Sequence, residues 1–160
     1  MFKIKHKITL SLILLFSIFA LISAYAIQYI LGHQPCNLCL IERIPFIMVI
    51  IIITLTLFLQ KFEKISLIII SLIFFSATLI SFYHFGIEQG FITESLVCDL
   101  SIENNALTKE EILNQLKLTT INCKDVTFKI LGLSLATINI FISLILSATT
   151  LKLFLNYEKI

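Results

Sequence analysis

The sequence predicts an all-α membrane protein, a four-helix transmembrane bundle with two outer loops. Of its 160 residues 58% are hydrophobic, and only 14% are charged. A water-soluble domain carries roughly 25% charged residues, because much of its surface faces solvent. The composition therefore excludes a soluble enzyme, and a net charge of +2 is too small for a nucleic-acid-binding surface.

Four long apolar stretches are the second observation that predicts this fold class. A membrane-crossing helix needs about 20 largely apolar residues, and we predict spans at about residues 8–31, 44–60, 65–83 and 130–152 of a single domain, 1–160. The intervals 32–43 and 84–129 form the outer loops. Ser and Thr inside the spans are expected to pack between helices and to form side-chain hydrogen bonds to neighbouring backbone, and the amide Asn139 is expected to have a packing or hydrogen-bonding role.

The lysines that flank the spans predict the orientation. With four spans, the N-terminal flank, the turn between the second and third spans, and the C-terminal end lie on one side. These segments hold Lys3, Lys5, Lys7, Lys61, Lys64, Lys152 and Lys159. Since short segments rich in lysine stay cytoplasmic, we expect a multi-pass protein of a bacterial inner membrane with both termini in the cytoplasm.

An alternative interpretation of the N-terminus is a cleaved secretory signal. Lysines, an apolar core and the small-x-small segment 24–26 fit that pattern. The apolar run continues to Leu31, however, which suits a span better than a signal core. Cleavage would leave both outer loops on the same side of the membrane.

All four cysteines fall in the outer loops: Cys36 and Cys39 in the first, Cys98 and Cys123 in the second. In an oxidising compartment such cysteines form disulfides, and four of them allow three connectivities. A C-x-x-C disulfide closes almost no chain, so it removes little entropy from the unfolded state. The Cys36–Cys39 spacing therefore indicates redox exchange rather than a structural bridge.

Arg43 follows the C-x-x-C motif at the start of the second span. If the segment from Cys36 is helical, Cys36, Cys39 and Arg43 share one face at spacings of three and four. A permanent cation there would favour a thiolate and would bind an anionic partner at membrane depth. An arginine at the border of a span faces the bundle interior or extends to the surface.

The cysteines have two alternative uses, in a structural zinc site or in structural disulfides. In a structural zinc site the two cysteines of each pair are close in the sequence, whereas Cys98 and Cys123 are far apart. Two purely structural disulfides are the other alternative. We predict no resident metal.

The long outer loop is expected to contain a short amphipathic helix. Thr108 and Glu111 form a capping box, and Leu107 and Ile112 fit the accompanying hydrophobic staple. The residues that follow place an apolar face on one side of the helix. Such a segment lies on a membrane surface, between Cys98 and Cys123.

Three stretches resemble the disulfide bond formation protein B (DsbB) family. The sharpest is residues 35–43, PCNLCLIER, which is similar to the family run P-C-x-L-C-x-x-x-R. Residues 83–88, YHFGIE, and 131–134, LGLS, are weaker likenesses. The layout of four spans, with a C-x-x-C in the first outer loop and two cysteines in the second, extends the resemblance over most of the chain.

This resemblance implies a membrane oxidoreductase. It would reoxidise a periplasmic thioredoxin-like disulfide oxidase (DsbA type) and pass the electrons to the membrane quinone pool, ubiquinone or menaquinone. By matching position, Cys98 and Cys123 would exchange with the partner, and Cys36 and Cys39 would lie next to the quinone. Arg43 and His84 would bind the quinone. A partner of the DsbA type has a reduction potential of about −120 mV, so only a strong electron acceptor such as a quinone could keep it oxidised.

A rival interpretation is a non-enzymatic membrane subunit whose outer loops are stapled by disulfides or zinc. It predicts unreactive cysteines and no bound quinone.

Overall fold

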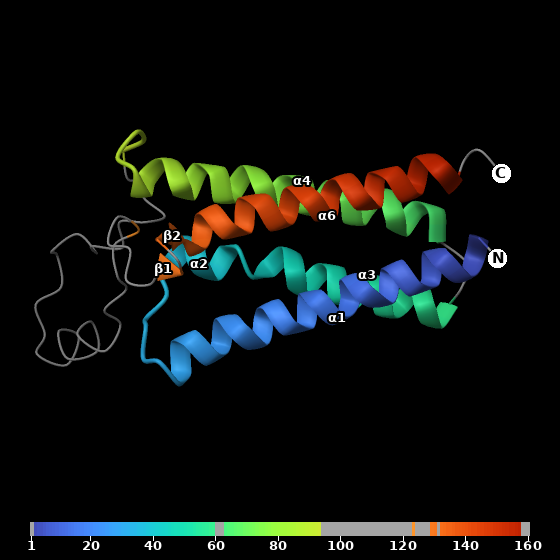
Figure 1. Cartoon of the computed structure of the whole chain (residues 1–160), viewed down its shortest axis with the longest axis horizontal. Helices are drawn as coiled ribbons and strands as arrows, with labels where there is room; N and C mark the ends of the chain where they lie inside the picture. Colours follow the sequence, from blue (N-terminus) through green and yellow to red (C-terminus); the bar gives the residue numbers. More distant parts are fainter. Residues whose placement is uncertain (1, 60–62, 94–122, 124–128, 131, 158–160) are drawn as a thin grey trace, which may run out of the picture.

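The bundle consists of four long helices that run side by side (Figure 1). They are α1 (Phe2–Tyr29), α3 (Ile44–Leu59), α4 (Glu63–Glu88) and α6 (Leu135–Tyr157). The computed structural model describes residues 2–59, 63–93, 123, 129–130 and 132–157. Cys98 and the amphipathic segment predicted around residues 107–116 lie outside these residues.

Each long helix marks a stretch that is long and apolar enough to cross a membrane, with the short helix α2 (Asn37–Ile41) included in the second. Both chain ends lie at one end of the bundle, and α2 with the strands lies at the other (Figure 1). The prediction of an all-α membrane protein with a four-helix bundle is confirmed. We call the end that contains Cys36, Glu88 and Ser134 the cysteine end.

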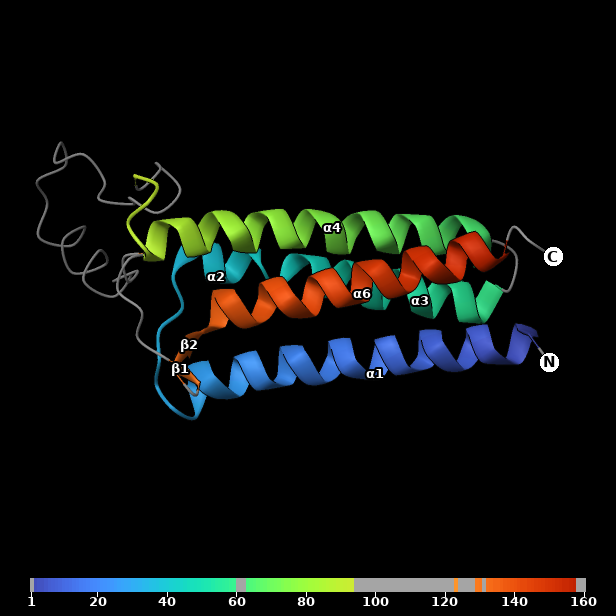
Figure 2. The ribbon, with the colours of Figure 1, turned by 45° about the horizontal axis from the view of Figure 1, so that its top comes forward.

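The helices pack in a chain of pairs: α4 contacts α6, α3 contacts α4, and α1 contacts α3 (Figure 2). The core between them is apolar, and the rings of Phe46 and Phe74 meet edge to face with centroids 5.8 Å apart. The other buried core residues are Leu10, Ile13, Val49, Ile53, Leu67 and Ile70. These buried core residues therefore come from α1, α3 and α4.

Large apolar side chains also cover the outside of the bundle. Phe58 is 85% exposed, and Leu15 and Phe82 are more than half exposed. In water such a surface would cause association, whereas in a bilayer it faces acyl chains. The exterior thus agrees with the four predicted spans.

Hydroxyl groups connect the helices within the apolar region. Ser71 Oγ donates to the carbonyl of Ser147, and Ser147 Oγ donates back to the carbonyl of Ser71. The hydroxyls of Thr56 in α3 and Ser66 in α4 lie 2.6 Å apart. Small hydroxyl residues allow helices to approach closely and to bond across the contact. The packing role expected for Ser and Thr is confirmed at these two contacts between helices.

Helix α4 continues past residue 83, where the third span was predicted to end. It ends at Glu88, and Gly90, at φ +75°, follows with two closing bonds. Gly90 N donates to the Ile87 carbonyl and Phe91 N to the Gly86 carbonyl, which is the Schellman pattern that a glycine with positive φ favours. His84 and Glu88 therefore belong to the helix rather than to the predicted loop 84–129.

Helix α6 begins at Leu135 rather than at residue 130. The preceding residues pair as two short antiparallel strands, β1 (Lys129–Ile130) and β2 (Leu133–Ser134), and Gly132 at φ +84° lies in the turn. Ser134 Oγ accepts a hydrogen bond from Thr137 N, so Ser134 caps the helix N-terminus. Apolarity alone cannot distinguish such a hairpin from a first helical turn.

Candidate functional site

The C-x-x-C motif forms a helix N-terminus at the cysteine end. Cys36 is the N-cap of α2, and its sulfur accepts a hydrogen bond from Cys39 N at 3.2 Å. Pro45 has no N–H to continue the helical bonding from Ile41, so α2 and α3 are separated by a turn at Glu42 and Arg43. The sequence thus places both thiols and two charged residues within two short turns.

His84 of α4 bridges Cys36 and Glu42. Its Nε2 lies 3.5 Å from Cys36 Sγ, and its Nδ1 lies 2.9 Å from Glu42 Oε1. His84 is 2% exposed and Glu42 is 8% exposed. An imidazole held between a sulfur and a carboxylate is oriented by both, and it can accept the thiol proton.

Asn139 of α6 extends this network into the bundle. Its Nδ2 donates to Glu42 Oε2 at 3.2 Å and to Ser81 Oγ at 2.8 Å. Its Oδ1 accepts from Ser143 Oγ. The hydrogen-bonding role expected for Asn139 is confirmed, and the carboxylate of Glu42 is fixed by groups from two other helices.

Glu88 lies one helical turn beyond His84. Its Oε1 is 3.7 Å from His84 Nε2, and its side chain is only 6% exposed. Within the described part of the chain, its Oε2 is buried and has no hydrogen-bond partner. A buried carboxylate oxygen without a partner is costly, so this atom is available to a ligand.

The Cys36 thiol is strongly acidified. The hydrogen bond from the Cys39 side chain is the largest cause, and it lowers the pKa of Cys36 from 9.0 to about 5 against the opposing effect of burial. The hydrogen bond and the positive charge of His84 lower this pKa further. The thiolate is the nucleophile in disulfide exchange, and the lowered pKa favours this form of Cys36 at neutral pH.

Arg43 is held against α1. Its Nη1 donates to Gln28 Oε1 at 2.7 Å, and its guanidinium carbon lies 4.9 Å from the centre of the Tyr25 ring. The side chain thus faces the bundle interior, one of the two placements expected at the border of a span. Its position is fixed by a hydrogen bond and a cation–π contact.

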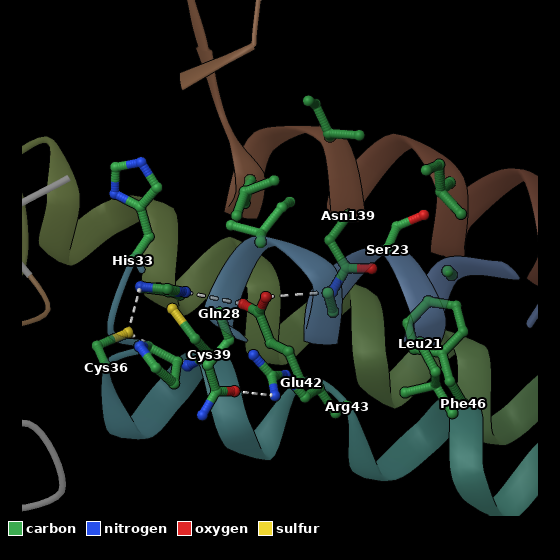
Figure 3. A pocket seen from close by; sticks show the side chains of 18 of the residues that line it. Leu21, Ser23, Gln28, His33, Cys36, Cys39, Glu42, Arg43, Phe46 and Asn139 are labelled. Carbon is green, nitrogen blue, oxygen red and sulfur yellow. Dashed lines mark hydrogen bonds and ion pairs between the residues drawn. The ribbon is translucent and has the colours of Figure 1, made fainter. Parts of the chain in front are cut away.

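These groups line one cavity of about 350 Å³ (Figure 3). Cys36, Cys39, Glu42 and Arg43 lie along its polar side, with Asn139 facing Glu42. Aromatic and aliphatic side chains from α1, α3 and α6 form the rest of the wall: Phe16, Phe19, Leu21, Ile27, Phe46, Leu135, Ile138 and Ile142. The cavity is therefore apolar with a charged, thiol-bearing end.

Cys123 also lines this cavity, although it comes from the second outer loop. It is disulfide-bonded, 3% exposed, and packs in one buried cluster with Cys36, Leu38 and Ile87. Cys36 and Cys39 are free thiols. The fold thus brings a cysteine of each predicted pair to the same place.

Of the site residues predicted from the sequence, Cys36, Cys39, Arg43, His84 and Cys123 lie around the cavity. Cys98 lies outside the described residues. The sequence reasoning gave no role to the further polar residues Gln28, Glu42 and Glu88. A signal was present for Glu42, since a carboxylate at the edge of a span is expensive unless it has a partner.

Comparison with known proteins agrees with this geometry. The family model described as "Disulfide bond formation protein DsbB" matches residues 6–153. The chain belongs to the DsbB family. An uncharacterized protein of Rickettsia prowazekii (strain Madrid E) is 31% identical over 146 residues, which cover 90% of this chain and 85% of the relative. No solved structure matches the chain.

Membership of the DsbB family fixes the general activity. The protein is a multi-pass membrane oxidoreductase of disulfide bond formation, and such an activity requires a partner for disulfide exchange. The free thiols of Cys36 and Cys39 and the disulfide-bonded Cys123 lie around one cavity of this chain.

Proposed function

We propose that this protein reoxidises a periplasmic thioredoxin-like dithiol oxidase of the DsbA type and passes the electrons to a membrane quinone. One observation carries the proposal. The free thiols of Cys36 and Cys39, disulfide-bonded Cys123 and the cation Arg43 all line one apolar cavity. A structural disulfide has no need of an acidified thiol or of a cavity beside it.

The residues around the cavity fit a quinone. Its volume of about 350 Å³ lies within the usual range of ligand sites, roughly 300–1,000 Å³. Phe19, Phe46 and Ile142 offer apolar faces to a flat ring. Arg43 has five N–H donors, of which one bonds to Gln28, so others are available for a ring carbonyl. A bound quinone, ubiquinone or menaquinone, would accept two electrons and two protons.

The chain's own residues perform the thiol chemistry. In the proposed first step, the partner's dithiol reduces the disulfide of Cys98 and Cys123 through a mixed disulfide with Cys98. The resulting dithiol then reduces the disulfide of Cys36 and Cys39. When Cys36 and Cys39 reform their S–S bond, they release two electrons and two protons, and His84, paired with Glu42, accepts the Cys36 proton.

The proposed location is a bacterial inner membrane with both termini in the cytoplasm. Lysine-rich termini at the end opposite the cysteines support this orientation. The cysteine end would then face the oxidising side of the membrane, where a soluble partner has access to the second outer loop.

Replacement of single cysteines tests the electron path. Cys123→Ser should accumulate a covalent adduct between Cys98 and the partner, visible on a non-reducing gel and lost on reduction. Cys39→Ser should permit partner exchange at the distal pair but stop quinone reduction. An adduct that maps to Cys36 would reverse the proposed path. If no variant traps a partner and the purified protein carries no extractable quinone, the alternative of a non-enzymatic subunit with stapled loops is supported instead.

A further inference from the structure

We propose that the reduced protein binds a thiophilic divalent cation, of which Zn²⁺ is the representative, through Cys36, Cys39 and His84. This set of ligands differs from the four-cysteine zinc site that the sequence disfavours, because it draws a histidine from another helix. It also goes beyond the proposed electron transfer, since metal binding changes no oxidation state.

The donor atoms already have the separation that a metal requires. One ligand atom from each of Cys36, Cys39 and His84 lies within 4.8 Å of the other two. Cys36 Sγ and His84 Nε2 are 3.5 Å apart. A tetrahedral zinc with Zn–S and Zn–N bonds of about 2.3 and 2.0–2.1 Å separates these two atoms by about 3.6 Å. The ion would therefore fit between them with little rearrangement.

Glu42 supplies the outer support that zinc-binding histidines use. Its Oε1 lies 2.9 Å from His84 Nδ1, on the side of the ring away from Cys36. When a metal displaces the Nε2 proton, the proton on Nδ1 stays shared with this carboxylate and Nε2 donates its lone pair. Asn139 in turn donates to the other oxygen of Glu42. The imidazole is thus held in the tautomer and orientation that a metal ligand needs.

Glu88 lies next to the three ligands but outside their cluster of mutually close donor atoms, so it would reach the metal as a fourth ligand by a shift of its side chain. Its Oε1 is 3.7 Å from His84 Nε2, and its side chain is only 6% exposed. Its Oε2 has no hydrogen-bond partner among the described residues. Carboxylate oxygens are ordinary zinc ligands. Two sulfurs and one nitrogen are therefore preformed, and the carboxylate of Glu88 or a solvent molecule would fill the fourth position of a tetrahedral site.

Binding and oxidation exclude each other at this site. The metal takes the place of the thiol protons, which are released to solvent, and no electron is transferred. When Cys36 and Cys39 form a disulfide, both thiolate donors are lost and the metal leaves. Zinc should therefore hold the pair reduced and inhibit quinone reduction. This last consequence rests on the proposed function, whereas the binding itself does not.

The test uses the full chain with Cys98→Ser and Cys123→Ser, so that Cys36 and Cys39 are the only thiols. After reduction with a phosphine, Co²⁺ is titrated in as a spectroscopic probe and then displaced by Zn²⁺. One equivalent of Co²⁺ should give thiolate-to-metal charge transfer and tetrahedral d–d bands. The oxidised protein should give neither, and this experiment requires no partner and no quinone.

Variants then identify the ligands. His84→Gln should weaken metal affinity at least about 100-fold, and Glu42→Gln about 10-fold, as loss of an outer partner does. Glu88→Gln should weaken it about 10-fold as well. The matched control is His33→Gln, because His33 lines the same cavity outside the cluster and its replacement should leave metal affinity unchanged.

Two results would overturn the inference. One is a Co²⁺ spectrum in the oxidised protein, or a Co²⁺ affinity that His84→Gln leaves unchanged, since either would show adventitious binding. The second comes from the parent protein and does not depend on how a variant folds. Zn²⁺ at ten times its Kd should slow alkylation of Cys36 about tenfold, with recovery on chelation, and unchanged alkylation would exclude the site.

Discussion

The two halves of the bundle are built from different chemistry. Toward the termini, buried polar groups are hydroxyls such as Thr150, which bonds to carbonyls of its own helix, and Ser71, which bonds across to α6. At the cysteine end, buried polar groups include the ionisable residues Glu42 and His84, each bonded to other elements. Hydroxyls are inexpensive in a membrane helix bundle, whereas ionisable groups are costly there.

This difference shows where stability and function are separated. The half of the bundle that contains Ser71 and Thr150, here called the termini half, is explained by packing alone. Its side chains Phe74, Ile70 and Ile53 are fully buried, and their contacts are apolar. The cysteine half contains more charge than packing requires. Its carboxylate, imidazole and thiol form a connected network, which is stable only because its members find partners.

The largest effect should be on the reactivity of Cys36. In the reduced protein with Cys98→Ser and Cys123→Ser, alkylation should be fast above pH 5 and slow below it, because the pKa of Cys36 is about 5 and only the thiolate reacts. Cys39→Ala removes the main cause of this lowered pKa. If the value returns to 9.0, the thiolate fraction at pH 6 falls about 1,000-fold.

The rate of alkylation with iodoacetamide across pH 4–10 measures this shift. Cys39→Ser keeps a hydroxyl donor and should retain part of the lowering. His84→Gln should raise the pKa less than Cys39→Ala does, since its contribution is smaller. Identical pH profiles in all four proteins would contradict the network at the cysteine end.

Loss of the proton acceptor should have the next largest effect. His84→Gln and Glu42→Gln should each lower the rate of quinone reduction about 100-fold, the usual contribution of general acid–base groups. Stopped-flow absorbance of the quinone measures this rate. Ser76→Ala is the control on the same helix as His84, because Ser76 is exposed and its hydroxyl donates to the Ile73 carbonyl of that helix. A rate within twofold of the parent protein in both variants would show that proton transfer does not use His84.

Arg43→Ala should raise the KM for quinone about tenfold while partner exchange is unaffected, as expected for a lost charge-assisted hydrogen bond. Arg43→Lys should recover part of the affinity, because an ammonium keeps the charge but not the planar geometry. Steady-state kinetics at varied quinone concentration separate KM from kcat. Lys64→Ala is the charge-matched control, because Lys64 lies in the first turn of α4, at the end of that helix away from the cysteines. An equal effect of Arg43→Ala and Lys64→Ala on the KM for quinone would show that Arg43 does not bind the quinone.

The smallest effect should come from the termini half. Ser71→Ala should reduce the free energy of unfolding by about 0.6 kcal/mol, because a typical hydrogen bond between membrane helices contributes about that much. Ser147→Ala should reduce the free energy of unfolding by a similar amount, because the hydroxyl of each serine donates to the carbonyl of the other. Unfolding in mixed detergent measures the change. A clear loss of quinone reduction in either variant would contradict the separation of the two halves.

Much of the site was predictable because its residues are close in the sequence. Cys36, Cys39 and Arg43 follow one another within two turns, and their spacing alone indicates redox chemistry. Glu42 was overlooked, although it stands between them, because nothing local shows which partner neutralises it. Asn139 was recognised as a hydrogen-bonding residue, but its partners Glu42 and Ser81 come from segments far away in the chain.

The four spans and the C-x-x-C motif at the start of the second one follow from the sequence alone. Those features depend on local composition and spacing, which hydropathy and residue chemistry read directly. Only the tertiary structure decided that His84 meets both Cys36 and Glu42, that Asn139 supports Glu42, and that Cys123 shares the cavity. The reason is physical: the rotation of α4 and α6 about their axes is set by packing along their whole length, and no single segment encodes it.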